Sequence, residues 1–204
     1  SHQSAAETRQ AFRQERLEAG AVGLDESERV VQRAPIDHAV AAMDLSQRIA
    51  TRQTAGSLPV SLTVDKPSGT AEFSIVWARN PTNVTWNVVT DLSQAGLGAE
   101  LSSQSALGFR PSCLDLYGDY GERYYAAVFV HDLATFGPVT VVSTVLPNQL
   151  AATVATQQAN GRQPYWIGAG CRDSEARACA LFSANAPAAE VLANVDLATF
   201  QSWV

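Results

Sequence analysis

The sequence repeats itself three times, and this repetition limits the possible folds more than any other feature. Gly56, Gly108 and Gly161 lie 52 and 53 residues apart. Each is followed three positions later by a proline and 21 positions later by a large aromatic residue, and aliphatic residues recur 7, 11 and 20 positions before it. The prolines are Pro59, Pro111 and Pro164, and the aromatic residues are Trp77, Phe129 and Phe182. Five anchors at matching offsets in three copies predict a tandem structural repeat.

Each copy contains the pattern of an amphipathic helix. In the second copy Leu97 and Leu101 lie four residues apart within residues 91–107. Thr90 or Asp91 could serve as the N-cap of this helix, and the anchor glycine lies where a left-handed C-cap residue belongs. The third copy places a proline in the first turn, where the missing N–H does no harm.

The residues around each helix are typical of strands. The anchor proline cannot continue a helix and fits the first residue of a strand. PVSLTV, PSCLDLY and PYWIGAG each lead through a turn to a second strand that ends at the aromatic anchor, and APIDHAV, TWNVVT and PVTVVS predict a short strand before the helix. The predicted fold class is α+β, with tandem β-α-β-β repeats of about 52 residues, each an amphipathic helix packed on an antiparallel hairpin. The repeats would stack as a solenoid or a ring.

These repeats divide the chain into five predicted parts. They are an N-terminal helical cap (1–33), three repeat units (34–83, 84–136 and 137–188) and the start of a truncated fourth unit (189–204). Because a natural domain rarely ends inside a helix that its neighbour needs for burial, we expect a fragment of a longer protein.

Composition argues against two classes of partner. The net charge is −6, and no cluster of lysine and arginine could neutralise a run of phosphates, so nucleic acid is not expected. No apolar run approaches the ~20 residues needed to cross a bilayer, and the start of the chain lacks the apolar region of a secretion signal. We therefore expect a globular protein without membrane segments, whose signal has been removed if its parent is secreted.

The chain shows no recognisable catalytic motif. The only lysine, Lys66, has Thr63 three positions before it, so the Ser-x-x-Lys pair of β-lactamase-like hydrolases is absent. Cys113 and His131 could act as nucleophile and base, but nothing in the local sequence orients them, and His131–Asp132 is more typical of a polar pair at a strand end. We predict no catalytic, cofactor-binding or metal-binding residues.

The second unit carries a family resemblance. The segment GFRPSCLDLYGDYGERYYAAVF (108–129) resembles bacterial tandem repeat modules that accompany β-lactamase-like serine hydrolases, and a similar architecture forms the N-terminal region of secreted fungal polyglycine hydrolases. The resemblance covers roughly residues 34–204 and is weakest in the first unit. It implies a non-catalytic domain attached to a C-terminal β-lactamase-like serine endopeptidase that cleaves glycine-rich linkers of plant chitinases. The expected partners are that catalytic domain and a protein substrate such as a plant chitinase.

Two features favour a secreted protein. Cys171 and Cys179 flank the turn of the third hairpin, where facing strand residues can form a disulfide, although two reduced buried thiols are the alternative. Asn83, followed by Val-Thr, begins a glycosylation sequon between the first and second units. Disulfides and glycans are both typical of extracellular proteins.

Two binding functions remain open, with an independent enzyme as a third and weaker alternative. In a docking or scaffold domain, the candidate partner-binding residues are those of the second hairpin that do not recur in all units: Tyr117, Tyr120, Arg123 and Tyr124. In a carbohydrate-binding or cell-wall-binding module, Tyr117, Tyr120, Tyr165 and Trp166 would share one exposed face. Packing instead predicts that Trp77, Tyr125, Phe129 and Phe182 are buried between helix and sheet.

Overall fold

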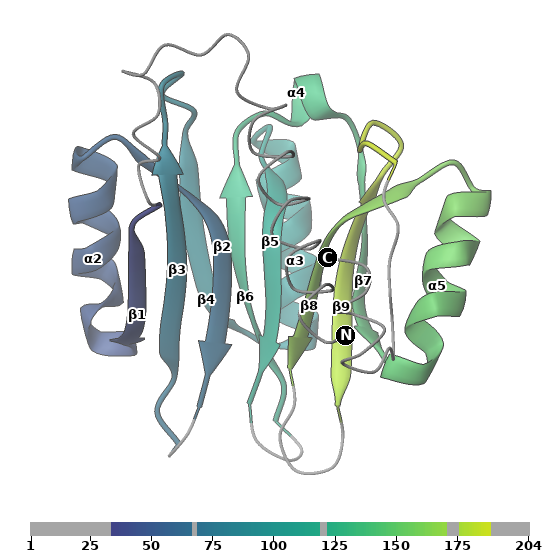
Figure 1. Ribbon diagram of the computed structural model, residues 1–204, viewed down its shortest axis with the longest axis horizontal. Helices are drawn as coiled ribbons and strands as arrows, with labels where there is room; N and C mark the ends of the chain where they lie inside the picture. Colours follow the sequence, from purple (N-terminus) through teal and green to yellow (C-terminus); the bar gives the residue numbers. More distant parts are fainter. Residues whose placement is uncertain (1–33, 67–68, 119–121, 171–175, 189–204) are drawn as a thin grey trace, which may run out of the picture. The chain divides into compact units, whose positions relative to one another are not determined.

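A computed structural model describes residues 34–66, 69–118, 122–170 and 176–188 (Figure 1). The chain divides into Ser1–Arg33 and Ala34–Val204, and every described residue belongs to the second of these parts. The predicted helical cap and the predicted start of a fourth unit therefore lie outside the described residues.

The predicted order of strand, helix, strand and strand is confirmed in all three units. The first unit contains β1 (Ile36–Ala41), α2 (Ala42–Thr54), β2 (Ser57–Asp65) and β3 (Glu72–Arg79). The second contains β4 (Trp86–Leu92), α3 (Gln94–Ala106), β5 (Arg110–Tyr117) and β6 (Tyr124–Val130). The third contains β7 (Val139–Val145), α5 (Pro147–Ala159), β8 (Gln163–Gly170) and β9 (Arg177–Ser183). A short helix that was not predicted, α4 (Leu133–Phe136), links the second unit to the third.

Each unit folds into a three-stranded antiparallel sheet. The second hairpin strand is central, so the sheets have the orders β1-β3-β2, β4-β6-β5 and β7-β9-β8. In every unit the register shifts directly after the anchor proline. The proline is thus the second or third residue of its strand, not the first as predicted, because a bulge accommodates a residue that cannot donate to the ladder.

The ends of the helices follow the repeat, with one correction. Gly56, Gly108 and Gly161 have φ values of 65°, 81° and 74°, which confirms the predicted left-handed residue after each helix. The helix of the second unit begins at Gln94, however, and its N-cap is Ser93, whose hydroxyl accepts from the third residue of the helix at 3.1 Å. Thr90 and Asp91, the predicted N-cap candidates, lie in β4.

Asp91 is not available as a helix cap because it forms part of a strand irregularity. Its φ is 56°, and the register of β4 shifts between Val89 and Leu92. The Tyr117 hydroxyl accepts from the Asp91 N–H and donates to the Asp91 carboxylate, both at 2.8 Å. These two hydrogen bonds hold the aspartate in a conformation that few residues other than glycine adopt.

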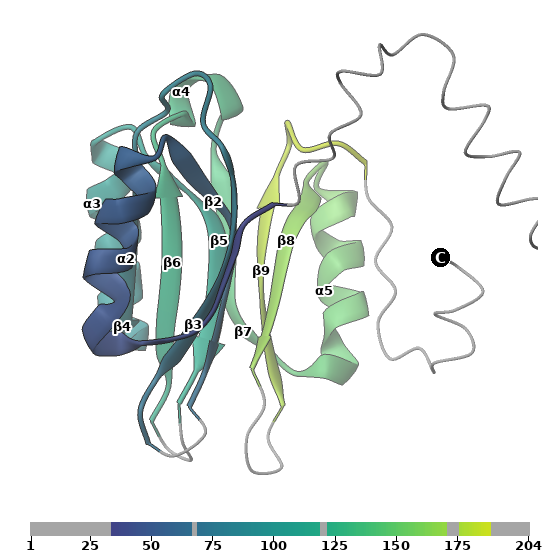
Figure 2. The same cartoon turned by 60° about the vertical axis from the view of Figure 1, so that its left-hand side comes forward.

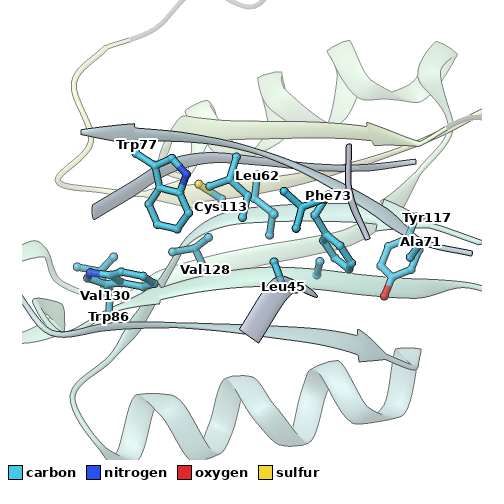
Figure 3. Close-up of a cluster of buried hydrophobic side chains, with 13 residues drawn as sticks. Leu45, Leu62, Ala71, Phe73, Trp77, Trp86, Cys113, Tyr117, Val128 and Val130 are labelled. Carbon is cyan, nitrogen blue, oxygen red and sulfur yellow. The ribbon is translucent and has the colours of Figure 1, made fainter. Parts of the chain in front are cut away.

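The three sheets follow one another, as Figure 2 shows for the described strands, and neighbouring sheets share a hydrophobic core. In the first and second sheets one face, here called the helix-side face, packs against the helix of its own unit and against the next sheet, and in the third sheet the equivalent face packs against α5. Phe73, Ile75 and Trp77 form this face in β3 and share one core with Leu45 of α2 and with Val128 of β6 (Figure 3). The same arrangement recurs between the second and third sheets, where Tyr125 and Phe129 pack with Leu181.

Burial along the central strands reflects this stacking. In β3, buried residues alternate with half-buried ones, so one face of the first sheet is covered and the other is partly open. All but the first residue of β6 and of β9 are buried. Trp77, Tyr125, Phe129 and Phe182 are fully buried, which confirms the packing prediction. Each contributes about 1.5–3 kcal/mol by leaving water.

Candidate functional site

The hypothetical cysteine nucleophile has an environment that disfavours chemistry. The Cys113 side chain is 1% exposed, and its thiol donates to the Val60 carbonyl at 3.5 Å. Burial raises the pKa of the Cys113 thiol to about 12, so it stays protonated near neutral pH, and the thiol is a much weaker nucleophile than the thiolate. The His131 ring packs on Phe109, with the ring centroids 4.9 Å apart, and contacts Gly108. The structure thus gives the two side chains different neighbours.

Asp132, next to His131, forms an ion pair with Arg110. Arg110 Nη2 donates to Asp132 Oδ2 at 2.8 Å, and Nε lies 2.7 Å from Oδ1, although only the first contact has hydrogen-bond geometry. The Arg110 guanidinium lies 3.6 Å from the ring centroid of Phe136 and 5.5 Å from that of Tyr165. Arg110 and Asp132 therefore connect the second unit to the third, as a polar pair at a strand end can do.

A buried ion pair in the first unit is also structural. Asp37 is 8% exposed and accepts from Arg52 Nε at 3.0 Å, from Arg52 Nη2 at 2.7 Å and from Trp77 Nε1 at 2.8 Å. The hydrogen bond and charge of Arg52 lower the pKa of Asp37 despite its burial. This carboxylate orients the aromatic anchor of its unit, because it accepts a hydrogen bond from the Trp77 indole.

The described residues hold neither a metal-binding cluster nor a membrane-spanning helix. Within the described ranges no group of three or more histidine, cysteine, aspartate or glutamate side chains could hold a metal ion. No helix in the same part of the chain is long and apolar enough to cross a lipid bilayer.

Side chains of the third unit reach across to β5. Tyr165 Oη donates to the Pro111 carbonyl at 2.7 Å, and Trp166 Nε1 donates to the Leu114 carbonyl at 2.8 Å. The Cys179 thiol also donates to the Leu114 carbonyl, at 3.2 Å. We call the contact of β2, β5 and β8 with these cross-unit hydrogen bonds the inner seam.

The inner seam removes most of the expected sugar-binding platform. Tyr165 and Trp166 are half-buried in it, and their polar atoms are used by backbone carbonyls. Tyr117 is 7% exposed and bound to Asp91, while Tyr120 lies outside the described residues. The described aromatic residues therefore do not form a common exposed face, and no observation favours the carbohydrate-binding alternative.

The partner-binding candidates fall into two groups. Tyr117 supports the fold through Asp91, whereas Arg123 is exposed and Tyr124 is half-buried at the end of the second hairpin. The rings of Tyr117 and Tyr124 pack with their centroids 6.1 Å apart. The structure thus brings these two tyrosines together but gives only the second one access to solvent.

Two further residues join this end of the hairpin. Lys66 Nζ lies 5.8 Å from the Tyr124 ring centroid, and the Tyr124 hydroxyl donates to Glu122 Oε2 at 3.3 Å. Sequence reasoning missed Lys66 as a neighbour, although its repeat position, 52 residues before Gly118 at the end of β5, could have indicated it. We call Lys66, Glu122, Arg123 and Tyr124 the hairpin-end cluster.

The predicted disulfide is not shown. Cys171 lies outside the described residues, and Cys179 has a free, fully buried thiol. The strand partner of Cys179 is Gly168, three residues before Cys171, because the register places Cys179 inside the hairpin and away from its turn. Burial raises the pKa of the Cys179 thiol to about 12. The disulfide stays a prediction.

The sequon lies in an exposed link. Asn83 and Thr85 are exposed between β3 and β4, and Asn83 has a φ of 50°. The nearby Asn80 amide is bound to both the N–H and the carbonyl of Val84, at 2.9 and 2.8 Å. This clamp leaves the sequon asparagine on the outside of the loop, and its glycosylation stays a prediction.

The fold and contacts define the class of the protein before any comparison with known proteins. Three α+β units with equivalent sheets, helices and bulges share continuous cores, so the chain is built from tandem structural repeats. Residues 83–132 match a family described as polyglycine hydrolase-like, structural repeat. The match coincides with the second unit and confirms the resemblance inferred from its sequence. No curated protein matches the chain.

Proposed function

We propose that the chain is a non-catalytic repeat domain of a secreted serine endopeptidase that resembles polyglycine hydrolase. The observation that carries this proposal is the family match at residues 83–132, in the unit with the sharpest resemblance. The repeated anchor residues support it, because the structure uses them for packing and turns. A C-terminal β-lactamase-like domain would perform the cleavage. The repeat domain would dock a protein substrate such as a plant chitinase.

The surface we assign to docking is the hairpin-end cluster. The exposed Arg123 and half-buried Tyr124 belong to residue types that are enriched at the centres of protein interfaces. Arg123 belongs to none of the three buried cores, and Tyr124 packs against the first core only as a partly buried residue. The exposed sequon at Asn83 supports secretion, since a glycan there would meet no core residue. Further stacking of units as a solenoid or ring would extend the docking surface.

The test compares two substrates of the complete parent protein. Deletion of this domain, or the double substitution Arg123→Ala and Tyr124→Ala, should slow cleavage of a whole chitinase about 10-fold or more, because one or two central contacts each contribute over 1 kcal/mol. Cleavage of a short glycine-rich peptide should change little. Arg79→Ala, which removes an exposed arginine at the end of β3, is the matched control.

Three outcomes would contradict the proposal in different ways. Equal losses on protein and peptide would mean that the domain only supports folding. Equal effects of the cluster variant and of Arg79→Ala would move docking away from the hairpin end. Cleavage of the peptide by the isolated domain would show a catalytic site in this chain.

A further inference from the structure

A single carboxylate lies where the three units meet. Asp115 in β5 is 4% exposed, and its Oδ2 accepts from the Val64 N–H of β2 at 2.7 Å. Its Oδ1 lies 3.1 Å from the position that a Cβ atom on Gly168 of β8 would occupy. One side chain of the second unit therefore contacts the inner strands of both neighbouring units.

This carboxylate lacks the partner that the other buried aspartate has. Asp37 is paired with Arg52, whereas no cationic side chain in the described ranges forms an ion pair with Asp115. A buried charge with hydrogen bonds but no counter-charge is costly, and such a group binds a proton more readily than it would in water. The inner seam thus holds an ionisable group whose charged form is disfavoured by its position.

We propose that Asp115 is a proton-binding site at which protonation stabilises the stacking of the three repeats. The groups that face it come from each packed element: a backbone amide from β2, a glycine from β8 and the Cys179 thiol from β9. On its own strand the titratable neighbour is Cys113. Both thiols are buried with raised pKa values, so both are neutral near pH 7 and neither places a charge next to the carboxylate.

The sign of the effect follows from the direction of the shift. Desolvation raises the pKa of Asp115 from 3.8 to about 6, although the amides of Val64 and Leu116 oppose the shift. A carboxyl group with a higher pKa in the folded state stabilises the fold fully below its unfolded pKa. That stabilisation is lost as the pH rises through the folded value. The seam should therefore be more stable at pH 4–5 than at pH 7, as far as this group is concerned.

Asp115→Asn tests this directly, because asparagine keeps the acceptor and the shape but cannot titrate. The unfolding equilibrium constant of each protein is measured in urea from pH 4 to pH 7.5. On going from pH 7.5 to pH 4, the unfolding constant of the wild type should fall by ~60-fold relative to that of Asp115→Asn, because the pKa of Asp115 rises from 3.8 to about 6 on folding. If the ratio of the wild-type unfolding constant to that of Asp115→Asn does not change with pH, the proposal is overturned.

Two controls keep the result interpretable. Asp37→Asn should show the opposite trend, with the wild-type advantage declining as the pH falls, because the pKa of Asp37 is lowered. If Asp115→Asn does not fold, a ¹³C NMR titration of the wild-type aspartate carboxyl groups decides the question. One midpoint near 6, assigned to Asp115, supports the proposal, and a midpoint near 4 refutes it.

Discussion

Gly168 should be the least replaceable glycine of the inner seam. It lies in β8 without a positive φ, so alanine would meet no backbone strain there. Its added Cβ, however, would lie 2.3 Å from the Leu114 carbonyl oxygen and 3.0 Å from Cys179 Sγ. Because the first contact is with backbone, no side-chain rotation can relieve it. Gly168→Ala therefore tests mainly the packing of the third unit on the second, because its shortest contact is with the Leu114 carbonyl of β5.

The expected loss follows from these distances. To reach ordinary contact, β5 and β8 must separate by about 1 Å, and forcing an extra methyl group into packed structure costs about 1–3 kcal/mol. The same movement would stretch the 2.8 Å hydrogen bond from Trp166 to the Leu114 carbonyl. A buried carbonyl that loses its partner costs about 1–3 kcal/mol more. We expect a total loss of about 2–6 kcal/mol in the free energy of unfolding.

Urea titration and thermal unfolding measure this loss. For a chain of this size, the predicted change corresponds to a fall in Tm of roughly 4–24 °C. Gly98→Ala is the matched control, because Gly98 is exposed within α3 and an added Cβ meets no atom within 4 Å. It should raise stability by about 0.5–1 kcal/mol. A Gly168→Ala protein within about 0.5 kcal/mol of the wild type would refute the packing argument.

Two further predictions concern other contacts of the same units. Arg110→Ala should lower the free energy of unfolding, measured in urea, by about 2–3 kcal/mol. The substitution leaves the Asp132 carboxylate without its partner and removes the cation from the Phe136 ring. A loss no larger than that of Arg79→Ala would contradict this prediction. The second prediction concerns the three thiols after treatment with a reductant and its removal. At pH 8 at most one of them should react with a disulfide reagent in the folded protein, because burial raises the pKa values of Cys113 and Cys179 to about 12. In urea all three should react. Fast reaction of two or three thiols before unfolding would show that the cysteines are accessible.

The elements of each unit could be predicted because the repeat supplies three independent readings of one pattern. Leu97 and Leu101 define a helix in the second copy, and the same positions are aliphatic in the other two. The predicted start of that helix was wrong because Asp91, a residue type that is common at N-caps, precedes the true N-cap, Ser93. Only the Tyr117 hydroxyl, 26 residues away, shows why Asp91 stays in the strand.

The candidate site was harder to predict than the fold for a related reason. Residues that do not recur were assigned to binding, and this reasoning succeeds only where a non-recurring residue faces solvent. Tyr117 does not recur, yet it is buried and holds a bulge. Lys66 was set aside as the lone lysine of a missing motif, but it lies over the Tyr124 ring. The contact between the hairpin ends of adjacent units depends on tertiary structure, so it cannot be predicted from the sequence of one unit.

One repeat position shows what the differences between copies encode. Thr63, Asp115 and Gly168 occupy equivalent places, each opposite the same position of its central strand. Thr63 is exposed, the Asp115 carboxylate binds the Val64 amide, and Gly168 leaves the space that Asp115 Oδ1 and the Leu114 carbonyl fill. Each of the three residues thus fits the interface at its own place in the stack. A side chain at position 168 would occupy the space that the Asp115 carboxylate fills. The residue at this position therefore differs with the interface that it occupies, while the recurring anchors support the shape of each unit.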